Sequence, residues 1–262
     1  MGQRLPRTPG SGDPRWVTAL SVQLYTVRED LAEDLPGTLD RLAALGLSHV
    51  EPFLLTHYAA ALGPALASSG LTAPTAHQHF VGTATADEIF AMAAELGVGT
   101  VFDPRVDRER FETADGVAAV ADELNAAAAV AATHGVRVGY HNHAQELEIV
   151  LDGTTALEML ADHLDDGVVL EVDTYWAAVG GQDPAALLKR LGDRVTAVHV
   201  KDGPATPDPI DQVAVGQGEL PVREILAAAP QALRVVELDD TRGNRFQAVA
   251  DSCAWLRAEG LA

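Results

Sequence analysis

Short runs rich in β-branched residues alternate along the chain with longer Ala- and Leu-rich stretches in which apolar residues recur at helical spacing. Strands buried in a parallel sheet are nearly continuous apolar runs, and the helices that cover them carry one apolar stripe. The pattern therefore predicts repeated strand–helix units, eight of each. The predicted strands are residues 19–24, 48–52, 72–76, 100–103, 137–141, 168–173, 195–200 and 234–238. The predicted helices include residues 36–45, 86–96, 115–133, 155–163, 184–191, 222–228 and 245–258.

Helix-ending and helix-starting residues agree with these boundaries. A glycine follows an apolar helical run at Gly46, Gly70, Gly97 and Gly135, where a left-handed cap is expected, and Asp183-Pro184 is typical of a helix start. Eight units in about 250 residues predict a single (β/α)8 TIM barrel over residues 16–262. An open doubly wound sheet is the alternative, but no Gly-rich phosphate turn follows the first strand. Residues 1–15, rich in Pro, Gly and Arg, are expected to form a disordered leader.

The charged residues and the single cysteine bear on which partners and which compartment are expected. The chain has 18 Lys and Arg against 38 Asp and Glu, a formal charge of −20, which disfavours nucleic acid. The single Cys253 cannot form an internal disulfide, and no secretion signal is seen, so we expect a cytoplasmic protein. No uninterrupted apolar segment reaches the roughly 20 residues that a membrane span needs. A homo-oligomer is compatible with the sequence.

Polar residues end four consecutive predicted strands, and these ends meet at one face of a barrel. His141, Asp173, His199 and Glu237 occupy those ends and are separated by 32, 26 and 38 residues, about one unit each. Two imidazoles and two carboxylates suit a divalent ion such as Mn, Mg, Co or Zn. Each residue alone has a simpler explanation, as a helix cap or a hydrogen-bonded histidine. Their coincidence at four successive strand ends favours one divalent metal site.

Neighbouring residues leave alternatives open. Side chains two apart on a strand point the same way, so His143 could replace His141 as ligand, and Glu171 is expected one layer deeper as an acceptor. His77 and His79, at the third strand, are candidates for substrate contact or for structural use. Trp176, just past the sixth strand, is a candidate wall against a sugar ring or a core aromatic.

Several motifs resemble the sugar phosphate isomerase/epimerase family of the xylose isomerase-like TIM barrel superfamily, which also holds inosose isomerases and dehydratases, ketose 3-epimerases and endonuclease IV. The motifs are SVQLYTVR at 21–28, YHNH at 140–143, EVDTYW at 171–176, HVKD at 199–202 and VGQGEL at 215–220. The resemblance implies a barrel with one divalent ion, and Asp173, His199 and Glu237 match three of its ligand positions. The fourth position is usually Glu, and His141 stands there.

This departure changes the expected chemistry. Three carboxylates leave one net negative charge around a dication, whereas His141 in place of Glu leaves none, so the ion should be a stronger Lewis acid. It also removes one of two carboxylates that the epimerases use as proton carriers, unless Glu146 replaces it. The resemblance thus implies a subgroup acting on oxidised sugars or cyclitols.

The predicted reaction is isomerisation or epimerisation of a keto-sugar or cyclitol through an enediolate formed beside a metal-bound carbonyl. Glu237 is the first candidate base and Glu146 the second, and Lys201 is a candidate donor or oxyanion partner. A metal-dependent lyase or dehydratase acting on 3-keto-glycosides or inososes uses the same residues. A non-catalytic binding or partner subunit with the same barrel is the third hypothesis. An endonuclease would need a basic DNA face, which the charge does not supply.

Overall fold

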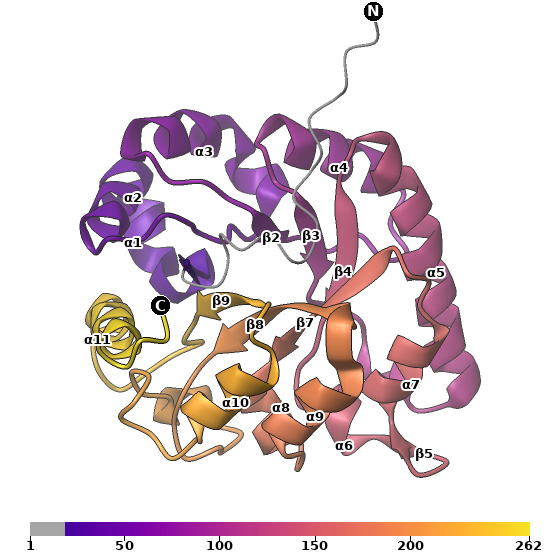
Figure 1. Ribbon diagram of the computed structural model, residues 1–262. Coiled ribbons are helices and arrows are strands. Elements are labelled where there is room, and N and C mark those ends of the chain that lie inside the picture. The colour runs from indigo at the N-terminus through magenta and orange to yellow at the C-terminus, as the bar shows by residue number, and fades with distance from the viewer. Residues whose placement is uncertain (1–18) are drawn as a thin grey trace, which may run out of the picture.

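A curled sheet of seven parallel strands forms the centre of the molecule, as seen in the computed structural model, which describes residues 19–262 (Figure 1). The predicted leader, residues 1–15, lies outside the described residues. The strand order is β1-β9-β8-β7-β4-β3-β2, and every neighbouring pair is parallel. The strands are β1 Leu20–Val22, β2 Thr75–His77, β3 Thr100–Asp103, β4 Arg137–His141, β7 Val168–Asp173, β8 Val195–Val200 and β9 Leu233–Val236. A separate antiparallel pair joins β5 Val150–Leu151 to β6 Thr154–Thr155.

Residues 49–53 connect the two edges of this sheet. Glu51 forms a parallel bridge with Gln23, just past β1, and Phe53 forms one with His77 of β2. The backbone bonds Leu24 N to Glu51 O and His77 N to the carbonyl of Pro52 close the ring. The second predicted strand, residues 48–52, is thus present as isolated bridges rather than as a continuous strand.

Helices surround the strands on the outside (Figure 1). Four strands, β3, β4, β7 and β8, begin and end where the sequence predicts, and the seven predicted helices agree within about a residue. The helices outside those predictions are α1 (Arg28–Glu33), α3 (Leu55–Ser69), α6 (Gln145–Glu148) and α8 (Thr174–Val179). The α-helices are α1 Arg28–Glu33, α2 Leu35–Ala44, α3 Leu55–Ser69, α4 Ala86–Glu95, α5 Ala114–Thr133, α6 Gln145–Glu148, α7 Ala156–His163, α8 Thr174–Val179, α9 Pro184–Leu191, α10 Val222–Ala228 and α11 Arg245–Ala258.

The strand side chains form two apolar regions. The larger lies between strands and helices, and a small second cluster lies inside the ring, contributed by Phe102, Val169, Ala197, Leu233 and Val235. Because side chains alternate along a strand, the residues two and four positions farther along point into the same interior, nearer the carboxyl ends. This apolar base supports the polar side chains above it.

The segment after β8 is organised by one carboxylate. Asp202 accepts four backbone N–H bonds, from Gly203, Gly216, Gly218 and Leu220, at 2.8–3.1 Å. A Cβ added to Gly218 would lie 2.1 Å from Asp202 Oδ1. The Asp of HVKD and the glycines of VGQGEL therefore act together as a structural unit. No helix among residues 19–262 is long and apolar enough to cross a bilayer.

Candidate metal centre and active-site pocket

Polar side chains fill the barrel interior in layers above the apolar base. Along β7, Val169 lies in the base, Glu171 lies one layer higher, and Asp173 comes next at the strand end. The sequence predicted this order, with Glu171 deeper than Asp173, from the two-residue period of a strand.

The inner cluster consists of three histidines and two glutamates, all buried: Glu51, His77, His141, Glu171 and His199. Glu171 Oε2 lies 2.5 Å from His77 Nε2, 3.0 Å from His141 Nδ1 and 3.1 Å from His199 Nε2. Glu51 Oε1 lies 2.8 Å from His199 Nε2. Each glutamate keeps one oxygen without a hydrogen-bond partner. The carboxylates therefore fix the orientation of the imidazoles.

The surroundings set the charge of each member of the inner cluster. Burial and the nearby His199 hold the pKa of His141 well below 6.5. Burial also opposes charge on His199, but Glu171 and Glu237 outweigh it and raise the pKa of His199 well above 6.5. Burial would raise the pKa of Glu171, but His199 and His77 hold it well below its usual range. Glu171 is thus ionised beside a charged His199 and a neutral His141.

The rim cluster lies nearer the strand ends and consists of Asp173, His199, Lys201, Glu237 and Asp239. His199 Nδ1 is 2.5 Å from Glu237 Oε2 and 4.0 Å from Asp173 Oδ2. Ligand atoms of Asp173, His199 and Glu237 lie within 4.8 Å of one another, close enough to share one ion.

His141 reaches the rim cluster with its second nitrogen. Its Nε2 is 3.9 Å from Asp173 Oδ2, while its Nδ1 contacts Glu171. His199 is used the same way, with Nε2 toward the inner carboxylates and Nδ1 toward the rim. A carboxylate behind each imidazole is the usual support of a metal-binding histidine. His77, His141, Glu171 and His199 form a second set within 4.8 Å.

Lys201 places a buried ammonium in the rim cluster, beside the charged His199. Its Nζ is 2.8 Å from Asp173 Oδ2, 2.8 Å from Glu237 Oε2 and 2.6 Å from Asp239 Oδ2, and its side chain is 1% exposed. Burial would lower the pKa of Lys201, but these three carboxylates raise it well above 10.5. Burial opposes ionisation of Glu237, but Lys201 and His199 hold its pKa well below its usual range.

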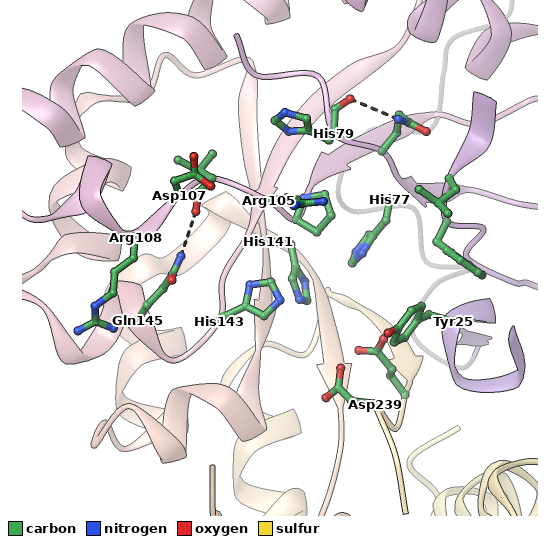
Figure 2. A pocket seen from close by; sticks show the side chains of 16 residues that line it. Tyr25, His77, His79, Arg105, Asp107, Arg108, His141, His143, Gln145 and Asp239 are labelled. Atoms are coloured by element: carbon green, nitrogen blue, oxygen red, sulfur yellow. Dashed lines mark hydrogen bonds between the residues drawn. The ribbon is translucent and has the colours of Figure 1, made fainter. Parts of the chain in front are cut away.

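A pocket of about 620 Å³ opens above the two clusters. Four cluster members line the pocket: His77 and His141 of the inner cluster, and Glu237 and Asp239 of the rim cluster. In Figure 2, Tyr25 lies on one side of His141, and Arg108 and Gln145 lie on the other. The remaining lining residues are Phe53, Leu54, Gln78, His79, Pro104, Arg105, Val106, Asp107 and His143.

Three of the four predicted substrate-binding residues line the pocket, and the fourth does not. His77, His79 and His143 line the pocket, although His77 also belongs to the inner cluster and His79 Nδ1 lies 3.1 Å from Asp103. His143 is half-buried, with its ring centre 5.3 Å from that of His141. Trp176 does not line the pocket, and its indole N–H donates to Asp239 Oδ2 at 3.1 Å.

Glu146, the second candidate base, is not among the residues that line the pocket. It is fully buried, and its oxygens accept hydrogen bonds from the Tyr140 hydroxyl at 2.6 Å, the His143 N–H at 2.8 Å and Gln145 Nε2 at 2.9 Å. These three donors hold its carboxylate in place in the segment after β4.

Two acidic residues of the site were not among the sequence-based candidates. Glu51 comes from the second predicted strand, residues 48–52, and the rule of polar strand ends would have selected it. Asp239 follows Glu237 by two residues, so the two-residue period points its side chain into the same barrel end. Its Oδ2 accepts from Lys201, Trp176 and Gln212, and it lines the pocket.

Known proteins resemble this chain over most of its length. A solved sugar phosphate isomerase/epimerase from Parabacteroides distasonis is 25% identical, with a TM-score of 0.79, covering 98% of this chain and 99% of that chain. A solved IolI protein with a bound zinc atom is 15% identical, with a TM-score of 0.65, covering 93% of this chain and 97% of that one.

A curated inosose dehydratase from Geobacillus kaustophilus is 32% identical over 118 residues. That match spans 43% of this chain and only 37% of the dehydratase. The model of the family described as "Xylose isomerase-like TIM barrel" matches residues 28–259, nearly all of the described chain. The match includes every residue of both clusters, and the chain therefore belongs to the xylose isomerase-like TIM barrel family.

Proposed function

We propose that the protein is a divalent-metal-dependent enzyme that isomerises or epimerises a keto-sugar or cyclitol. The ion would be held by His141 Nε2, Asp173, His199 Nδ1 and Glu237. The observation that carries the proposal is that ligand atoms of Asp173, His199 and Glu237 lie within 4.8 Å of one another, beside a pocket that Glu237 lines. Relatives in the family include isomerase/epimerases and a dehydratase, and one contains zinc.

The donor set fits a dication chemically. Five buried or partly buried carboxylates stand in the two clusters against two cationic groups, Lys201 and the charged His199. Excess negative charge of this kind needs compensation in a low-dielectric interior. Nitrogen and carboxylate oxygen together suit Mn, Co or Zn, and Mg less well.

The rim set fits better than the inner set. Glu171 Oε2 already contacts three imidazole nitrogens, which an ion bound among them would have to displace. At the rim, the same histidines offer their opposite nitrogens with Glu171 and Glu51 as supports. The rim also borders the pocket through Glu237.

A divalent ion bound there supplies a Lewis acid that stabilises negative charge on a substrate carbonyl oxygen, an effect of several kcal/mol. Glu237 acts as the base. Glu237 lines the pocket and its Oε2 contacts His199 and Lys201, so Oε1 is the oxygen that would take a proton from the carbon beside the carbonyl. Return of that proton to the neighbouring carbon, together with transfer of the hydroxyl proton from one oxygen to the other, completes an isomerisation.

Lys201 is a positioning residue in this scheme. An ammonium has three N–H bonds, and the three carboxylates around Lys201 occupy them. It therefore holds Glu237 ionised, which a base requires, and orients Asp239 toward the pocket.

A lyase or dehydratase acting on a keto-glycoside or inosose is the second candidate. Glu237 is the only carboxylate of the predicted acid–base pair that lines the pocket, because Glu146 is fully buried. One base is enough to start the loss of a β-substituent, whereas epimerisation needs a proton donor on the opposite face.

The test is proton exchange followed by NMR in deuterated water. Metal-loaded protein is incubated with a panel of keto-sugars, keto-glycosides and inososes. Wild type should incorporate deuterium beside the carbonyl, and Glu237→Gln should not, because an amide cannot accept that proton. Glu95→Gln, on the exposed face of α4, is the matched control and should exchange like wild type.

Full exchange in Glu237→Gln would remove this residue from the role of base. Appearance of an elimination product would favour the lyase. Absence of bound metal together with absence of exchange would favour a non-catalytic binding protein.

A further inference from the structure

Exposed apolar side chains gather at the pocket mouth. Among residues 19–262, four large hydrophobic side chains are markedly exposed: Tyr25 at 38%, Leu54 at 52%, Val130 at 37% and Val150 at 56%. Two of the four, Tyr25 and Leu54, line the pocket, and the half-buried Phe53 lies between them in the lining. We call Tyr25, Phe53 and Leu54 the apolar wall.

The apolar wall is held rigidly. The rings of Tyr25 and Phe53 pack edge to face with centroids 5.3 Å apart, and the guanidinium of Arg28 lies 4.2 Å from the Tyr25 ring centre. Gln23 Oε1 accepts from the Tyr25 N–H at 3.1 Å, and Gln23 Nε2 donates to Glu51 Oε1 at 2.9 Å. The wall is therefore tied to the inner cluster beneath the proposed metal site.

Leu54 occupies a strained backbone conformation. Its φ and ψ are 49° and 53°, in the left-handed region that a leucine enters at a cost of about 1–2 kcal/mol. Its carbonyl accepts the N–H bonds of His57 and Tyr58 that begin α3, which holds it there. Strain that leaves a large apolar side chain exposed beside a pocket points to use of that side chain by a ligand.

Charged side chains line the pocket away from the apolar wall. Asp107 and Arg108 lie across His141 from Tyr25 in Figure 2, and His79, Pro104, Arg105 and Val106 are also among the lining residues. The volume of about 620 Å³ lies well within the range of pockets for drug-sized ligands, which are larger than one sugar ring. The pocket therefore suits a ligand with a polar part and an apolar part.

We propose that the substrate is a glycoside whose aromatic aglycone packs against the apolar wall, rather than a free sugar. The sugar ring then lies over His141 and Glu237, where the proposed reaction occurs, and the aglycone lies toward Leu54 and Tyr25. The position of the sugar rests on the proposed function. The position of the aglycone rests on the apolar wall alone.

The test is calorimetric titration of the full-length protein with two unreactive probes, phenyl β-D-glucopyranoside and methyl β-D-glucopyranoside. The phenyl probe should bind at least about tenfold more tightly, which burial of roughly 55 Å² of apolar surface provides at ~25 cal/mol per Å². Leu54→Ser and Tyr25→Ser should each reduce the ratio of the two affinities toward one. Val150→Ser changes an equally exposed side chain in β5, outside the pocket, and should keep the ratio.

Equal affinities for the two probes, or no binding of the phenyl probe up to about 10 mM, would overturn the proposal. So would a phenyl preference that survives both wall variants. A change of oligomeric state in Leu54→Ser without a change in the ratio would show that the wall covers another copy of the chain.

Both probes lack a carbonyl, so their binding does not depend on the reaction. A phenyl preference in wild type without any deuterium exchange would leave the wall in place and refute the proposed chemistry. Exchange on free keto-sugars with no phenyl preference would support the proposed chemistry and refute the aglycone site.

Discussion

Replacing Lys201 by Met removes the positive charge of this side chain and keeps most of its volume. Its Nζ contacts three carboxylates at 2.6–2.8 Å, and the side chain is 1% exposed, so solvent cannot take over its role. The variant leaves Asp173, Glu237 and Asp239 close together without their cation.

The expected loss of stability follows from this geometry. Removing one partner of a buried ion pair costs about 3–5 kcal/mol, because the remaining charge is left uncompensated. For a chain of this size, 1 kcal/mol shifts the melting temperature by about 2–4 °C, so the metal-free variant should melt roughly 6–20 °C lower. A dication bound by Asp173 and Glu237 supplies the missing positive charge, so it should stabilise the variant more than wild type.

The assay is thermal unfolding of chelator-treated protein, with and without saturating Zn²⁺ or Mn²⁺. Lys189→Met is the matched control, because the only other lysine of the chain is exposed on α9, and it should unfold like wild type. A Lys201→Met variant that melts within about 2 °C of wild type, or that gains no more from metal than wild type does, would refute this reasoning.

Two further changes test the supports of the site. Glu171→Gln should weaken metal affinity about 10–100-fold without abolishing it, because Glu171 orients His141 and His199 rather than binding the ion; isothermal titration measures this, and complete loss would make Glu171 a ligand. Asp202→Ala should lower the free energy of unfolding by about 2–4 kcal/mol, because four backbone N–H groups lose their acceptor; urea denaturation measures this, and an unchanged midpoint would contradict the structural role of Asp202.

The parts of the fold that the sequence predicted best are those with a continuous apolar run. Strands β3, β4, β7 and β8 are fully or almost fully buried, so their composition marks both ends. Residues 49–53 pair only through isolated bridges, and their pattern is correspondingly weaker.

Polar strand ends predicted the three residues whose ligand atoms lie together, but not the burial of Glu146 or the exposure of Leu54. Asp173, His199 and Glu237 follow from strand ends and the two-residue period, and the structure brings their ligand atoms together. The burial of Glu146 depends on the Tyr140 hydroxyl beneath it, and the exposure of Leu54 depends on a left-handed backbone. Neither property is visible in the spacing of residues, because both depend on how loops pack in three dimensions.

The number of divalent ions bound per chain tests the central claim most directly. Elemental analysis after dialysis against Zn²⁺ or Mn²⁺ should find one equivalent in wild type and essentially none in Asp173→Asn, which keeps the shape of a rim ligand and removes its charge. Wild type that retains no ion, or an Asp173→Asn variant that retains a full equivalent, would contradict the account.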